Sequence, residues 1–220
     1  MDDRLAAAQK YVGNKGLDAD IVGGLQLRLL QMNGLTPSHR VLEIGCGCLI
    51  AGKPLLGFLD SGRYVGVEPN VWLLDAALTD PEIRRLVNEK RPLFLFNEDF
   101  DASAAGRFDY VISHSILSHA AEWQLPQFMA GVAACLNTDG VAIVSIRFSD
   151  EQGNLTGDSH HQEWVYPEGR SGGTSSYRPE TAYAAAAAAG LACEWMHDYR
   201  ATVTAAAPTN FHDWLRLRPA

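Results

Sequence analysis

A glycine-rich segment follows a short apolar run early in the sequence. The run Val41-Leu42-Glu43-Ile44 leads directly into Gly45-Cys46-Gly47-Cys48. Glycines placed just after a strand let the backbone turn tightly and approach a ligand without an intervening side chain. In an open parallel sheet, ligands bind at the carboxyl ends of the strands. The segment therefore indicates a ligand-binding loop.

An acidic residue, Glu68, ends the next β-branched run, Tyr64 to Glu68, about 20 residues after the glycines. A carboxylate at the end of the second strand of a βαβ unit can accept hydrogen bonds from the hydroxyls of a ribose. Together, the glycines and Glu68 predict a cofactor that contains a ribose.

A second acid, Glu43, distinguishes between two such cofactors. A nicotinamide dinucleotide places a pyrophosphate at the glycine loop, and a nearby carboxylate would repel it. The third glycine of the dinucleotide fingerprint is only loosely met, by Ala51 or Gly52. The ammonium group of a methionine moiety would instead be attracted to Glu43. Glu43 therefore favours S-adenosylmethionine over NAD.

These segments resemble the class I S-adenosylmethionine-dependent methyltransferases, from about Val41 to Arg147 at the level of motifs. The resemblance implies that Glu43 to Gly47 wrap the methionine part and that Glu68 binds the ribose. It also implies a turn into the fifth strand at Leu136 to Val141. In the glycine-rich loop, Cys48 occupies the position where many members of the family have a third glycine. The residues that the resemblance assigns to the cofactor are Glu43, Gly45, Cys46, Gly47, Glu68, Pro69, Asn70, Asp99, Phe100, Ser113 and His114. Among these, Pro69 and Asn70 flank the adenine, Asp99 receives its amino group, Phe100 lies against the ring, and Ser113 and His114 end the fourth strand.

Histidines are the candidate general bases, because an oxygen or nitrogen acceptor must lose a proton when it is methylated and a histidine has an unperturbed pKa of about 6.5. The candidates are His114, His119, His160 and His161. Structural roles are the alternative for each, and they suffice for His39, His197 and His212. Residues 112–120 resemble a metal-binding turn of small-molecule methyltransferases, but serines replace its acids, so no metal is expected.

Strands alternate with helices along most of the chain, which predicts an α/β fold of the Rossmann-like class I methyltransferase type. We expect a mostly parallel seven-stranded sheet with helices on both faces and an antiparallel C-terminal strand. The expected strands are residues 40–44, 64–68, 93–96, 108–113, 141–147, 191–199 and an edge strand at 211–218. The expected helices are residues 18–32, 49–59, 71–89 with a possible break near Pro81, 122–136 and a run of alanines at 184–189.

The chain is expected to form a single methyltransferase domain over residues 1–220. Residues 1–36 would form a helical N-terminal cap. Residues 149–177 form a long polar stretch, which inside a compact domain is typical of an active-site lid. Because no second domain is expected, these two additions or a second subunit would choose the acceptor.

Composition limits the partners. The 220 residues carry a formal net charge of -8 and no basic cluster, which argues against nucleic acid. The start of the chain lacks the pattern of a signal peptide, and no apolar run has the roughly 20 residues that span a bilayer, so a cytoplasmic protein without membrane association is expected. We expect a monomer or homodimer that methylates a small molecule in specialised metabolism. A non-methylating S-adenosylmethionine-binding protein and an NAD-dependent oxidoreductase stay open as alternatives.

Overall fold

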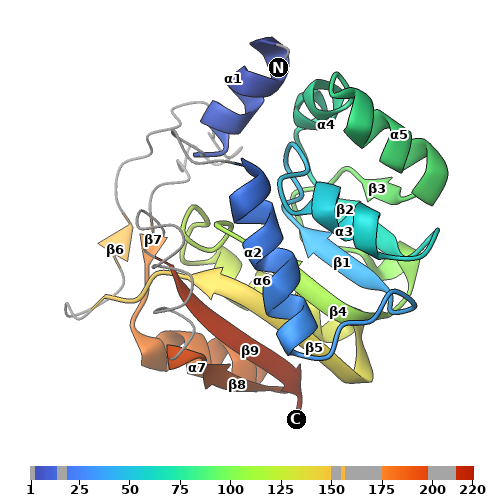
Figure 1. Cartoon of the computed structure of the whole chain (residues 1–220). Coiled ribbons are helices and arrows are strands. Elements are labelled where there is room, and N and C mark those ends of the chain that lie inside the picture. Colours follow the sequence, from blue (N-terminus) through green and yellow to red (C-terminus); the bar gives the residue numbers. More distant parts are fainter. Residues whose placement is uncertain (1–2, 14–18, 150–154, 157–174, 198–211) are drawn as a thin grey trace. The chain divides into compact units, whose positions relative to one another are not determined.

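The structure is a computed structural model, and it describes residues 3–13, 19–149, 155–156, 175–197 and 212–220 (Figure 1). Seven strands form one sheet in the order β3-β2-β1-β4-β5-β9-β8. β1 pairs in parallel with β2 and β4, and β2 pairs in parallel with β3, whereas β9 runs antiparallel to both β5 and β8. The sheet confirms the expected fold class.

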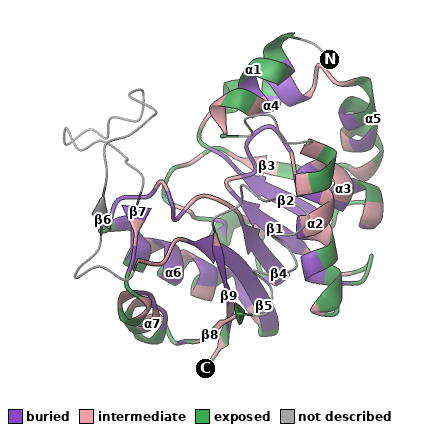
Figure 2. Cartoon of the chain, turned by 60° about the vertical axis from the view of Figure 1, so that its left-hand side comes forward, coloured by how far each residue is buried: buried purple, intermediate pink, exposed green. Residues whose placement is uncertain are grey.

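The chain divides into two compact units, Met1–Ile112 and Ser113–Ala220. The first unit contains the strands β1 (Val41–Ile44), β2 (Tyr64–Val67), β3 (Leu93–Leu95) and most of β4 (Phe108–Ser113). All four residues of β1 and of β2 are buried, as the strand colours in Figure 2 show. Such continuous burial is typical of strands in a parallel sheet that is covered on both faces.

The helices of the first unit are α1 (Asp3–Tyr11), α2 (Ala19–Met32), α3 (Gly52–Phe58), α4 (Val71–Ala77) and α5 (Pro81–Lys90), followed by a short 3₁₀ turn at Ser103–Ala105. α1 packs against α4, and α3 lies against both α2 and α5. α2 and α3 confirm the helices expected near residues 18–32 and 49–59.

The expected break in the helical stretch 71–89 is confirmed, because the chain forms two helices there. The side chain of Asp80 accepts hydrogen bonds from the backbone N–H groups of Glu82 and Ile83, at 2.8 and 3.1 Å. Pro81 then occupies the first turn of α5, where its missing N–H costs nothing. The sequence Asp80-Pro81 therefore starts a new helix.

The second unit contains α6 (Gln124–Cys135), β5 (Leu136–Ile146), β6 (Leu155–Thr156), β7 (Ser175–Ser176), α7 (Pro179–Ala188), β8 (Leu191–Trp195) and β9 (Asp213–Pro219). α7 packs against α6 and β8. The alanine run lies in α7, between Pro179 in its first turn and Gly190 in the left-handed region with φ of 74°. The proline and glycine punctuation correctly predicted this helix. No helix in the described ranges is both long enough and apolar enough to cross a membrane.

Two expectations for the second unit are wrong. β9 is not an edge strand, because it lies between β5 and β8 and pairs with both. Trp214 and Leu215 are successive residues and are both buried, so both faces of β9 are covered. In addition, residues 136–141 belong to β5 rather than to a turn before it. A hydrophobic pattern shows which faces are buried, but it does not show how many strands lie alongside.

Candidate functional site

The glycine loop in the first unit turns sharply at the carboxyl end of β1. The backbone N–H groups of Gly45 and Cys46 both donate to the carbonyl of Val67, the last residue of β2, at 2.8 and 3.0 Å. Gly45 and Gly47 both lie in the left-handed region, with φ of 78° and 49°. Side chains other than glycine disfavour this conformation, which explains why the loop needs glycine at these two positions.

The loop has a third left-handed residue, and it is Leu49 rather than Cys48. Leu49 has φ of 62°, and its N–H donates to the carbonyl of Cys46 at 2.8 Å. A leucine in this conformation costs roughly 1–2 kcal/mol. Its side chain is completely buried, and this burial offsets the cost.

Glu68 directly follows β2 and ties the end of that strand to the glycine loop. Its Oε2 accepts from the N–H of Gly47 at 3.1 Å, and its Oε1 accepts from the backbone N–H and side-chain amide of Asn70 at 2.9 and 2.8 Å. Burial raises the pKa of Glu68, and the hydrogen bonds from Asn70 and Gly47 oppose this change. A carboxylate has about four acceptor positions. Oε2 therefore keeps capacity for a further donor.

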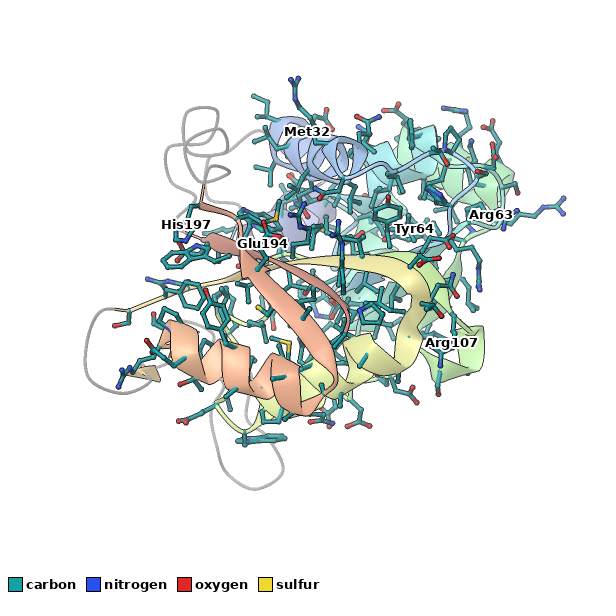
Figure 3. All side chains as sticks on the ribbon, turned by 90° about the horizontal axis from the view of Figure 1, so that it is seen from below. Met32, Arg63, Tyr64, Arg107, Glu194 and His197 are labelled. Atoms are coloured by element: carbon teal, nitrogen blue, oxygen red, sulfur yellow. The ribbon has the colours of Figure 1, made fainter. Side chains whose placement is uncertain are left out.

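Glu43 lies in the middle of buried β1 and faces a tyrosine. Its Oε2 accepts from the hydroxyl of Tyr64 at 2.6 Å, and both side chains are buried. Figure 3 shows the Tyr64 ring among the interior side chains, whereas the neighbouring Arg63 extends outward. Burial raises the pKa of Glu43 to about 8, the hydrogen bond from Tyr64 lowers it, and the charge of Glu68 raises it further. The Glu43 carboxyl is therefore mostly protonated at neutral pH.

The side chain of Cys46 lies beneath the glycine loop, over a glycine of β2. A Cβ atom on Gly66 would lie 2.7 Å from Cys46 Sγ, so only glycine leaves room there. Burial raises the pKa of the Cys46 thiol well above its usual value and that of Cys48 to about 12. Both thiols are therefore protonated and serve as small packing groups rather than as nucleophiles.

The loop after β3 contains the two residues expected at the adenine. Asp99 is exposed and Phe100 is half-buried, with φ of 60°. The side chain of Asn97 closes the loop, because its amide donates to the carbonyl of Asp101 at 2.9 Å and its oxygen accepts from the N–H of Asp101 at 3.2 Å. The loop shape thus depends on Asn97.

The residues at the start of α4 directly follow Glu68 in the first unit. Pro69 is exposed, and the Asn70 side chain is held by Glu68. Trp72 is 43% exposed and meets Tyr11 of α1 edge to face, with ring centroids 5.0 Å apart. The N-terminal helix therefore lies beside the strand end that carries Glu68.

In the second unit, aromatic rings hold His114, which follows β4. The His114 ring stacks on Trp214 with centroids 5.4 Å apart and planes at 11°, and it meets His212 edge to face at 5.0 Å. Ser113 is buried, whereas His114 and His119 are half-buried. The two described candidate bases therefore lie partly open to solvent.

Two serines connect this segment to His212. His212 Nε2 lies 3.0 Å from Ser118 Oγ and 3.3 Å from Ser115 Oγ. Ser118 Oγ donates its one proton to the carbonyl of Ser115 at 3.0 Å, so we assign the proton of His212 to Nε2, with Ser118 accepting. Ser115 is left-handed, with φ of 65°, and its N–H donates to Ser145 Oγ at 2.7 Å. Non-glycine residues in this conformation concentrate at functional sites.

Burial lowers the pKa of His212 well below its usual value, and the neighbouring His114, His119 and Arg147 lower it further. His212 is therefore neutral at physiological pH. Within the described residues, no group of three or more His, Cys, Asp or Glu side chains is arranged to hold a metal ion.

A family model described as "Methyltransferase domain" matches residues 16–194, which is most of the chain. The chain belongs to this methyltransferase family. A search of curated proteins finds no significant match.

Solved structures share the fold of this methyltransferase. An S-adenosylmethionine-dependent methyltransferase from Clostridium acetobutylicum ATCC 824 is 12% identical, with a TM-score of 0.67 and 98% of each chain covered. The magnesium protoporphyrin IX methyltransferase of Synechocystis PCC 6803, solved with bound SAH, is 14% identical, with a TM-score of 0.62, 99% of this chain and 94% of that chain covered. The glycopeptide N-methyltransferase MtfA complexed with sinefungin is 12% identical, with a TM-score of 0.64 and 93% and 95% covered.

Two residues of this methyltransferase that the sequence does not indicate lie beside the candidate base His114. A structural role suffices for His212 in the sequence, and no pattern marks Trp214, yet both contact His114, about 100 residues earlier in the chain. Only the pairing of β9 with β5 brings them there. The one signal available in the sequence was a histidine two residues before a tryptophan at the start of the last strand. The candidate bases His160 and His161 and most of the expected lid, residues 149–177, lie outside the described residues.

Proposed function

We propose that this methyltransferase binds S-adenosylmethionine and transfers its methyl group to an oxygen or nitrogen atom of a small molecule. The single observation that carries the proposal is the hydrogen bond from Gly47 N–H to Glu68 Oε2 at 3.1 Å. It joins the glycine loop of β1 to the acid that ends β2, which is the arrangement that a ribose-bearing cofactor needs.

The residues of the first unit fit such a cofactor. Glu68 has a further acceptor position for a ribose hydroxyl, and Gly45 and Gly47 place no side chain between their backbone and the methionine part. Pro69, Asn70, Asp99 and Phe100 would surround the adenine. S-adenosylmethionine supplies a methyl group that is already activated on a sulfonium.

Glu43 would respond to the positive charge of the cofactor. Its carboxyl is held neutral by burial, and a nearby cation favours the ionised form. Binding of a cationic cofactor would therefore release a proton from Glu43, and the ionised carboxylate would attract the ammonium group.

A histidine would accept the proton that the acceptor loses during in-line attack. His114 is the first candidate, because it follows β4 directly and Ile112 of β4 is the register partner of Glu43 in β1. Adjacent parallel strands end at the same edge of a sheet, where ligands bind. Stacking on Trp214 fixes the plane of the His114 ring.

The remaining residues named from the sequence belong to the same proposal. Ser113, the buried last residue of β4, would contact the methionine part. The further candidates for the general base are His119, His160 and His161.

Calorimetry with S-adenosylmethionine, S-adenosylhomocysteine and NAD tests the cofactor. We expect the first two to bind and NAD not to bind; binding of NAD alone would show an oxidoreductase. Transfer of an isotope-labelled methyl group to small-molecule acceptors then tests the reaction. Binding without transfer to any acceptor would favour a non-methylating S-adenosylmethionine-binding protein.

The cellular context belongs to the same proposal. The net charge of -8 supports a small-molecule acceptor rather than nucleic acid. A cytoplasmic location, a role in specialised metabolism and a monomeric or homodimeric state complete the proposal. Cell fractionation tests the location, and gel filtration tests the oligomeric state.

A further inference from the structure

A cationic side chain, Arg147, adjoins the histidines of the second unit. Antiparallel pairing of β5 with β9 places Ile146 opposite Asp213. The residues next to this pair, Arg147 after β5 and His212 before β9, therefore face each other. Residues that are directly opposed across two antiparallel strands extend their side chains from the same face, with Cβ atoms about 5 Å apart. Arg147 and His212 therefore lie side by side.

The same face carries the aromatic support of His114. Two residues back along β5, Ser145 is the register partner of Trp214, and Trp214 stacks on His114. Side chains alternate along a strand, so the face that carries Ser145 and Trp214 also carries Arg147 and His212.

Backbone hydrogen bonds fix the position of Arg147. The N–H of Phe148 donates to Asp213 Oδ2 at 3.0 Å, and the N–H of Tyr177 donates to the carbonyl of Arg147 at 2.8 Å. The half-buried Arg147 side chain thus extends from a backbone that is held on two sides.

Arg147 supplies a permanent positive charge beside these histidines. The groups that act electrostatically on His212 are His114, His119 and Arg147, and each of them disfavours a charge on His212. Among the described residues, the Arg147 guanidinium forms no ion pair and no hydrogen bond. Arg216, by contrast, pairs with Glu194, and Arg40 donates to the carbonyls of Arg107 and Ala105.

We propose that Arg147, which adjoins His212 and lies on the face that carries Trp214, binds an oxyanion of the methyl acceptor, so that the acceptor is a small molecule carrying a carboxylate or a phosphate group. This inference rests on the proposed function, because the bound anion is a methyl acceptor only if the protein transfers a methyl group. The planar guanidinium of an arginine donates two parallel hydrogen bonds to a carboxylate or phosphate. Bound there, the acceptor would be oriented beside the ring of His114.

Binding of simple anions tests the subsite without requiring turnover. Protein with ¹⁵N-labelled histidines is titrated with benzoate, with inorganic phosphate and with neutral benzamide, and the imidazole resonances are followed. We expect benzoate or phosphate to shift the resonances of His212 and His114 with saturation, and benzamide to leave them unchanged. Comparing the two anions distinguishes a carboxylate acceptor from a phosphate acceptor. Absence of saturable shifts with both anions, or equal binding of benzamide, would overturn the proposal.

Two substitutions of similar size provide the matched test. Arg147→Gln is expected to weaken anion binding by about tenfold or more, because it removes a charged hydrogen-bonding partner. Arg218→Gln changes an exposed arginine of β9 and should leave anion binding unchanged. Arg147→Lys, which keeps the charge, should bind with intermediate affinity and covers the case in which the glutamine variant does not fold. Equal effects of the substitutions at residues 147 and 218 would refute the role of Arg147.

Cofactor calorimetry on the same samples separates the two proposals. S-adenosylmethionine binding without any anion binding would leave the proposed function standing and overturn only the subsite. Anion binding without S-adenosylmethionine binding would overturn the proposed function and leave an anion site.

Discussion

Replacement of Glu43 by glutamine should change how the stability of the protein depends on pH. In the folded chain burial raises the pKa of Glu43 to about 8, from an ordinary value of 4.5. Between pH 4.5 and about 8, the Glu43 carboxyl therefore carries a proton in the folded state but not in the unfolded state. The contribution of the protonated carboxyl to stability is complete below pH 4.5 and is lost as the pH rises through 8.

The size of the effect follows from this interval. Each pH unit between the two pKa values corresponds to about 1.4 kcal/mol. The interval from 4.5 to about 8 therefore amounts to about 5 kcal/mol in the free energy of unfolding. The glutamine carries no titrating proton and its amide oxygen still accepts from Tyr64. Relative to the native protein, Glu43→Gln should gain stability steadily as the pH rises from 5 to 8.

Urea unfolding at pH 5, 6, 7 and 8, followed by tryptophan fluorescence at constant ionic strength, measures the difference. Glu98→Gln is the matched control, because it makes the same substitution at an exposed position and should give no pH-dependent difference. A stability difference between Glu43→Gln and the native protein that stays constant from pH 5 to 8 would refute the assignment of a buried, protonated carboxyl.

Three further predictions concern the cofactor, the base and packing. Glu68→Ala should weaken S-adenosylmethionine binding by about tenfold or more in calorimetry, since charged hydrogen bonds contribute about 1.5–3 kcal/mol. Unchanged affinity would show that Glu68 does not bind the ribose. His114→Ala should lower kcat by about 10²–10⁴-fold at saturating cofactor, as measured by labelled-methyl transfer; an unaltered kcat would exclude His114 as the base. Gly23→Ala should destabilise α2 by about 3 kcal/mol in urea unfolding, because its Cβ would lie 2.0 Å from the carbonyl oxygen of Ile50. Adjacent Gly24→Ala meets nothing within 4 Å and should be neutral or stabilising, so equal losses at the two glycines would contradict this packing.

The strand-end residues of the first unit could be predicted from the sequence because local signals define them. Gly45 and Gly47 mark a tight turn, and Glu68 stands at the end of a β-branched run. Parallel strands bring their carboxyl ends to one edge, so an acid after one strand and glycines after its neighbour must meet. Their contact through the Gly47 N–H follows from these rules.

The environment of each group could not be predicted in the same way. The pKa of Glu43 depends on complete burial against Tyr64, and the left-handed residue at Leu49 depends on the space that its side chain fills. Neither property is visible in residue spacing, because burial and strain depend on the atoms that surround a side chain.

The sequence alone thus determined the order of helices and strands, the glycine loop and the acids after β2 and β3. Only the tertiary structure placed β9 between β5 and β8, and with it His212 and Trp214 beside His114. The physical reason is range. Turns, caps and hydrophobic periodicity act over a few residues, whereas the antiparallel strand β9, from the end of the chain, pairs with a strand about 70 residues earlier. The histidine cluster is a product of those long-range contacts.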